Sequence, residues 1–244
     1  MMKTKRNPAF IVSSGLWSNL KWTMLIFWII FIAAVVLINI FIRPQGIDVE
    51  LSESGVWANS STSPKIFMLV MGIVLTPVYL ASYVSSGITR KHFHIGAIQV
   101  FALLSLLSAC ILTIGFPVER ALVDWIGAAS LPDHPPLFRT LIENFFLIFG
   151  YFGCGWIIGT AFYRFNWKLG VVICVLSLIP LWTMETIAHA AGAMKGIGLQ
   201  GLDVDFIPSI GIGLEMLLFL LLSFAVFAVN RWMMRNITIK RKLT

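Results

Sequence analysis

The chain has 244 residues, of which 58% are hydrophobic and only 12% are charged, and its mean hydropathy is +0.89. Water-soluble domains contain about half apolar and about a quarter charged residues, so this composition nearly excludes a water-soluble enzyme. Eighteen lysines and arginines against eleven acids give a formal charge of +7, which in a soluble protein would suggest nucleic acid as a partner.

Residues 8–20 precede the first long apolar run and have a helical pattern of their own. Most of their apolar side chains, such as Val12, Leu16 and Leu20, share one arc of a helical wheel, and the polar ones face away. This pattern predicts an interfacial helix that lies on the inner leaflet of a membrane. A frayed tail is the alternative.

Six apolar runs are each long enough to cross a bilayer, whose hydrocarbon core of about 30 Å needs about 20 helical residues. They cover residues 22–42, 66–86, 95–116, 140–163, 169–190 and 209–231. The runs are apolar on all faces, as expected for helices surrounded by lipid and by one another. Together they predict an all-α polytopic membrane protein with a single transmembrane domain over residues 1–244.

Basic residues are distributed unevenly between the two sides of these spans. With the N-terminus inside, the inner segments hold thirteen of the eighteen lysines and arginines and none of the eleven acids. Positively charged loops stay on the cytoplasmic side, so both termini are predicted to be cytoplasmic. Topology and contact with anionic lipid then explain the positive charge, and no nucleic-acid partner is needed.

The inner segment 87–94, between the second and third spans, reads Gly-Ile-Thr-Arg-Lys-His-Phe-His. Gly87 can end a helix and Thr89 can cap the next one, while Arg90 and Lys91 present positive charge to the cytoplasm. By these properties alone, the segment is a basic turn.

The fourth span contains two glycines, Gly155 and Gly159, in G-x-x-x-G register. Small residues four apart let two helix backbones approach closely. The pattern predicts helix packing at this point, but it leaves open whether the partner is another span or a second copy of the chain.

Three glutamates, Glu143, Glu185 and Glu215, fall within the outer halves of predicted spans. Ionisable residues inside a membrane are costly and usually face protein or water, which makes them candidate functional residues. Glu185 and His189 lie four apart on one helix face and could share a hydrogen bond. We expect Glu185, His189 and Glu215 to line or gate a substrate path; a structural cap for the next connection is the alternative.

That next connection, residues 191–208, is apolar and holds four glycines. A loop this apolar is predicted to re-enter the outer leaflet, where irregular backbone must pack against protein or water. A plain flexible loop is the alternative.

The sequence lacks the common motifs of enzymes and of cofactor sites. It contains no H-E-x-x-H, no G-x-S-x-G and no G-x-x-x-x-G-K-[ST]. The three cysteines lie within spans without ligand spacing, and the four histidines form no obvious metal or haem set. We expect no catalytic residue, metal or cofactor in this chain, so any ATP with its Mg²⁺ would bind to a partner subunit.

The residues Gly87, Thr89, Arg90, Lys91 and Phe93 resemble the Gly-x-Thr-Arg-Lys-x-Phe segment that follows the second span in small permease subunits of type-2 ATP-binding-cassette exporters from Gram-positive bacteria. The six spans, the interfacial helix and the re-entrant element match that family in position. The resemblance implies that residues 87–94 form a coupling element that docks on a separate ATPase.

The same resemblance implies a homodimer or heterodimer of permeases in the bacterial plasma membrane. Its implied activity is the ATP-driven export of a lipid, a peptide antibiotic or a small drug. An ion-coupled carrier or channel without an ATPase, using Glu185, His189 and Glu215 as a proton relay, is one alternative. A membrane assembly or immunity factor that transports nothing is another.

Overall fold

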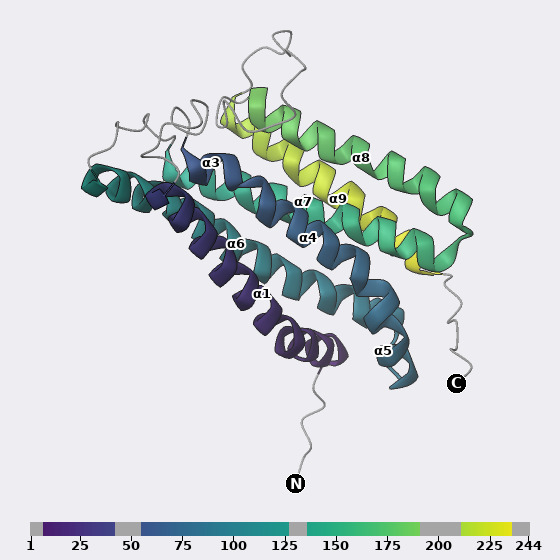
Figure 1. The fold of residues 1–244 in the computed structure, drawn as a ribbon. Helices are drawn as coiled ribbons and strands as arrows, with labels where there is room; N and C mark the ends of the chain where they lie inside the picture. Colours follow the sequence, from purple (N-terminus) through teal and green to yellow (C-terminus); the bar gives the residue numbers. More distant parts are fainter. Residues whose placement is uncertain (1–6, 42–54, 127–135, 191–210, 236–244) are drawn as a thin grey trace.

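The structure, a computed structural model, describes residues 7–41, 55–126, 136–190 and 211–235, and of Ile126, His189 and Ala190 it describes the backbone only. These residues form helices and the short turns that join them (Figure 1). The elements are α1 (Pro8–Phe41), α3 (Val56–Ser60), α4 (Thr62–Leu75), the π-helix η2 (Thr76–Leu80), α5 (Ala81–Ser85), α6 (Arg90–Ile126), α7 (Leu137–Arg164), α8 (Trp167–Ala190) and α9 (Ile212–Arg235).

The predicted all-α fold with six spans is confirmed. Six helices are long and apolar enough to cross a membrane, with the segment from α3 to α5 forming the second span. The chain is therefore a multi-pass membrane protein. Several helices extend beyond the predicted spans: α6 continues through Pro117 to Ile126, and its 37 residues rise about 55 Å, more than the hydrocarbon core requires.

Residues 8–20, predicted to form an interfacial helix, are helical and continuous with the first span, because α1 runs without a break from Pro8 to Phe41. No proline or glycine lies between Leu16 and Phe41 to stop it. In Figure 1 the first turns of α1 are seen nearly end-on and the rest from the side, so the helix axis changes direction. These turns pack on α6, where a Cβ at Gly96 would lie 2.7 Å from the carbonyl oxygen of Ala9.

The central helix of the bundle is α7, which contacts α4, α6, α8 and α9. In the most apolar 18-residue stretch of α7, 78% is buried inside the bundle, whereas the corresponding share is 22% in α8 and in α9. The backbones of α7 and α4 touch: a Cβ at Gly155 would overlap the carbonyl oxygen of Leu69, and one at Gly159 would overlap that of Ile73. The pairing of 69 with 155 and 73 with 159 shows that the two helices run in the same direction.

The two ends of the bundle differ in charge. The end with the turn between α5 and α6 and the last residues of α9, called the basic end here, carries Arg90, Lys91 and Arg235. The opposite end, called the carboxylate end here, carries Glu143, Glu185 and Glu215.

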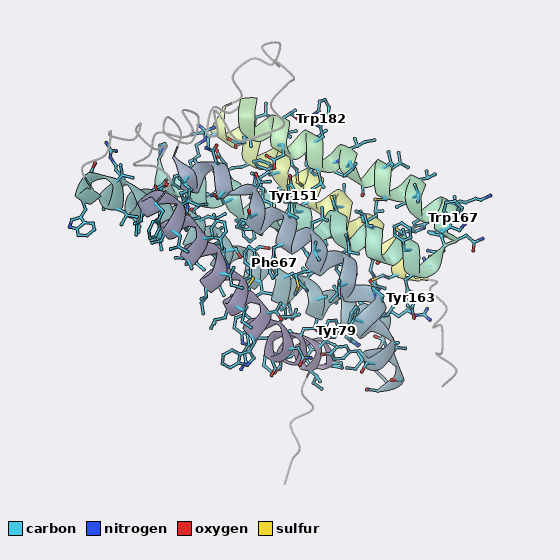
Figure 2. The ribbon with its side chains drawn as sticks, in the orientation of Figure 1. Phe67, Tyr79, Tyr151, Tyr163, Trp167 and Trp182 are labelled. Carbon is cyan, nitrogen blue, oxygen red and sulfur yellow. The ribbon has the colours of Figure 1, made fainter. Side chains whose placement is uncertain are left out.

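Exposed tryptophans lie toward both ends of the bundle. Figure 2 shows Trp167 and Trp182 toward opposite ends of α8, and both rings are exposed, as is that of Trp125 near the end of α6. Tryptophan favours the two borders of a membrane, so these positions fit a bundle that crosses one.

Candidate functional site

A partly buried ion pair joins α4 to α8 at the carboxylate end. The Nζ of Lys65 lies 2.8 and 3.1 Å from the two carboxylate oxygens of Glu185, and the hydroxyl of Tyr151 on α7 donates to the same carboxylate at 2.9 Å. The lysine side chain is 1% exposed and that of the glutamate 16%. Tyr151 lies inside the bundle in Figure 2, and its ring centroid is 5.9 Å from the Nζ of Lys65.

A second charged cluster joins α7 to α9 at the same end. Arg139 donates through Nε to Glu143 at 2.6 Å and through Nη2 to Glu215 at 3.0 Å. The side chains of the two glutamates are only 4% and 2% exposed. One guanidinium therefore serves two buried carboxylates, and Oε1 of Glu215 has no hydrogen-bond partner within the described residues.

The structure separates the glutamates that the sequence assigned to one path. Glu185 belongs to the cluster with Lys65 and Glu215 to the one with Arg139. The α7 members of these clusters, Tyr151 and Glu143, are eight residues and hence about 12 Å apart along the helix axis. The side chain of His189 lies outside the described residues, so its hydrogen bond to Glu185 stays a prediction.

Sequence reasoning missed Lys65, Arg139 and Tyr151 as partners of these glutamates. It counted Lys65 and Arg139 as residues of the outer loops, although each immediately precedes a predicted span. A basic residue at the edge of a span, in a chain with glutamates inside its spans, is a usable signal for a buried pair. Tyr151 carries no such signal.

A third carboxylate, that of Glu119 on α6, is buried without a cation bonded to it in the described contacts. It accepts hydrogen bonds from the side-chain amide of Asn39 at 3.1 Å and from the backbone N–H of Trp57 at 2.9 Å. Glu119 thus connects α6 to the end of α1 and to α3.

The turn at the basic end has the local structure that its residues predict. Gly87 adopts φ of +83° and has no atom within 4 Å of the position of a Cβ. The hydroxyl of Thr89 accepts from the backbone N–H of His92 at 3.4 Å and lies 2.8 Å from Nδ1 of its ring, which places Thr89 as the cap of α6. Lys91 is exposed.

Two of the five predicted docking residues make contacts within the bundle. Arg90 donates to the backbone carbonyl of Arg235 at the end of α9, at 3.1 Å. Phe93 is fully buried, with its ring centroid 5.7 Å from that of Tyr83. The ring of Phe93 belongs to the same buried apolar cluster as Val12 and Leu16 of α1. Within this bundle it supports the turn from the core, and its part in docking stays a prediction.

A polar group also lies deeper in the bundle, beside the π-helix. Trp156 donates through Nε1 to the hydroxyl of Thr76 at 2.9 Å, and that hydroxyl lies 3.0 Å from the one of Thr160. The ring of His94 stacks on Trp156 with a centroid distance of 4.9 Å. Thr76 begins the π-helix that contains Pro77, so the break in the regular helix is supported by side-chain hydrogen bonds.

An apolar groove of about 490 Å³ opens between α6, α7 and α9. Its lining has only apolar residues and glycine, among them Leu106, Phe145 and Met216. Within the described ranges, no three His, Cys, Asp or Glu side chains lie close enough to hold a metal ion.

Comparisons with protein-family models, with curated proteins and with solved structures found no match to this chain. Its function is therefore inferred from the residues and their geometry.

Proposed function

We propose that this chain is the transmembrane permease subunit of an ATP-driven exporter in a bacterial plasma membrane, and that it pairs with itself or a similar chain and with a separate ATPase. The basic end faces the cytoplasm in this proposal. The observation that carries it is the turn at residues 87–91, which combines an exposed surface with firm attachment to the spans.

The surface of this turn suits an acidic groove on a partner. Lys91 and Thr89 are exposed, and nothing surrounds Gly87. Behind this surface, Phe93 is anchored in the core and Arg90 holds the end of α9. A push on the turn is thereby transmitted to α6, to α1 and to α9 together, as coupling to an ATPase requires.

The opposite end has the contacts that an outward opening would change. The pair of Lys65 with Glu185 holds α4 to α8, and Arg139 holds α7 to α9. A path that opens between these helices separates at least one of these pairs. Among the described residues, the groove between α6, α7 and α9 is lined by apolar side chains and glycine, which favours an amphipathic cargo such as a lipid, a peptide antibiotic or a small apolar drug.

The test is co-purification from membranes with a candidate ATPase subunit, followed by ATP hydrolysis and transport in liposomes. Lys91→Glu reverses an exposed charge on the turn and is expected to reduce association and coupled transport at least tenfold. Lys168→Glu is the matched control, because Lys168 is an exposed lysine in the first turn of α8, at the same end of the bundle. It should leave both association and coupled transport unchanged.

A third variant separates the docking surface from the fold. Phe93→Ala should lower the thermal stability of the permease alone, whereas Lys91→Glu should not, since Phe93 is buried and Lys91 is exposed. If the Lys91→Glu variant binds the ATPase as strongly as the wild-type protein does, the assigned docking surface is contradicted. Absence of any association contradicts the proposed function itself.

The second candidate is an ion-coupled carrier. It is favoured by the shared guanidinium of Arg139, because two carboxylates with a single cation are suited to binding and releasing a proton. Solute flux driven by a pH gradient in liposomes without ATP would support this candidate. Partner binding without flux in either assay would favour a membrane assembly or immunity factor.

A further inference from the structure

Asn144 stands apart from the other buried amides of the bundle. It is 1% exposed, and neither its Oδ1 nor its Nδ2 has a hydrogen-bond partner in the described part of the chain. By contrast, the Nδ2 of Asn39 donates to Glu119 and that of Asn230 donates to the carbonyl of Gly153. The fold thus supplies at least one partner to the amide of each of those asparagines and none to Asn144.

Ser61 has the same deficit, since its hydroxyl is buried without a partner and the residue is 1% exposed. The packing of α4 on α7 places the two side chains on facing surfaces. Lys65 lies over the ring of Tyr151; Ser61 is four residues before Lys65, and Asn144 is seven before Tyr151, so each shares a helix face with its neighbour. By helical rise, Ser61 lies about 6 Å from Lys65 and Asn144 about 10 Å from Tyr151, in the same direction along the bundle.

The free-energy cost of burying the polar groups of Asn144 and Ser61 without hydrogen bonds indicates their role. Burying an amide in an apolar environment without hydrogen-bond partners is energetically unfavourable, and hydrocarbon offers it no partner. An apolar side chain at position 144 would avoid that cost. Asn144 and Ser61 together present three donors and several acceptor lone pairs within reach of a charged cluster, which is the arrangement that holds buried water.

We propose that Asn144 and Ser61 line a hydrated polar site between α4 and α7 at the carboxylate end, and that this site is reached by small hydrophilic molecules from that side of the membrane. The proposed site binds water and lies next to the ion pair of Lys65 and Glu185. It lies on the face of α7 that meets α4, away from the apolar groove. The inference does not depend on an ATPase, so it holds or fails separately from the proposed function.

The test measures the reactivity of introduced cysteines with the small hydrophilic reagent 2-aminoethyl methanethiosulfonate, in membranes, with Cys110, Cys154 and Cys174 replaced by alanine. Asn144→Cys should react at least tenfold faster than Ile148→Cys, which lies one turn further along α7 and is 0% exposed. Trp125→Cys, at an 83% exposed position, shows that the reagent reaches this end. Equal slow reaction at 144 and 148, with fast reaction at 125, overturns the proposal.

A second measurement covers the case in which Asn144→Cys does not assemble. In a dry site, Asn144→Leu removes an unsatisfied amide and should raise the thermal midpoint of the detergent-purified protein. In a hydrated site it removes a bonded group, and the midpoint should fall or the protein should fail to accumulate, as expected for Asn39→Leu, whose amide has protein partners. A raised midpoint in Asn144→Leu overturns the proposal.

Discussion

Lys65 and Glu185 form a partly buried ion pair between two spans that both pack on α7. The lysine nitrogen lies 2.8 Å from the carboxylate, and the lysine side chain is 1% exposed. The pair therefore ties α4 to α8 across the central helix, 120 residues apart in the chain. Tyr151 of that central helix completes the carboxylate's hydrogen bonds.

Removal of one partner of this pair should destabilise the bundle strongly. Glu185→Leu leaves a buried ammonium without a counter-charge, and the loss should be about 3–5 kcal/mol, as for other buried pairs that lose one member. The double variant Lys65→Met with Glu185→Leu removes both charges and should recover most of that loss. Thermal unfolding in detergent measures the difference.

The control for this experiment is Lys168→Met, which changes an exposed lysine and should be neutral. A double variant no more stable than Glu185→Leu would show that the two charges do not depend on each other in the folded protein.

The contact between α4 and α7 should tolerate no side chain at its glycines. Gly155→Ala places a methyl group against the carbonyl oxygen of Leu69, and Gly159→Ala places one against that of Ile73. Since neither partner is a movable side chain, each change should lower the yield of folded protein and its thermal midpoint by several degrees.

Gly213→Ala in α9 is the matched control, because nothing lies within 4 Å of its Cβ position. Alanine favours helix over glycine by about 1 kcal/mol, so this variant should be neutral or slightly more stable. An equal loss in Gly155→Ala and Gly213→Ala would contradict the close backbone contact.

The cluster at Arg139 should respond to the balance of its charges. Arg139→Gln leaves Glu143 and Glu215 as two buried carboxylates without the guanidinium that both now bind, so the bundle should lose stability by several kcal/mol. Adding Glu143→Gln removes one of the two like charges and should restore part of it. Thermal midpoints of the single and double variants, compared with Glu143→Gln alone, give the coupling.

A gain in stability from Arg139→Gln would mean that the free-energy cost of burying the guanidinium exceeds the stabilisation from its two ion pairs. In that case the cluster would serve transport at the expense of stability, and flux in liposomes should fall in the same variant.

The local features of the basic end could be predicted from the sequence more fully than the clusters at the carboxylate end. Gly87 and Thr89 act through their own backbone and nearest neighbours, so residue type was sufficient. The burial of Phe93 could not be predicted in this way: a ring next to exposed charges in the sequence suggests surface, and only the packing of the helices places it in the core.

What the sequence alone determined is the number of spans, the glycine pair suited to close packing and the unequal charge of the connecting segments. Each of these is a property of a continuous stretch of chain. Only the tertiary structure decided that Lys65 faces Glu185, that Arg139 binds Glu215 and that Asn144 has no partner among the residues that the structure describes. The physical reason is that a span apolar on every side carries no periodic signal of the face it turns inward, so its partners are set by packing between helices far apart in the chain.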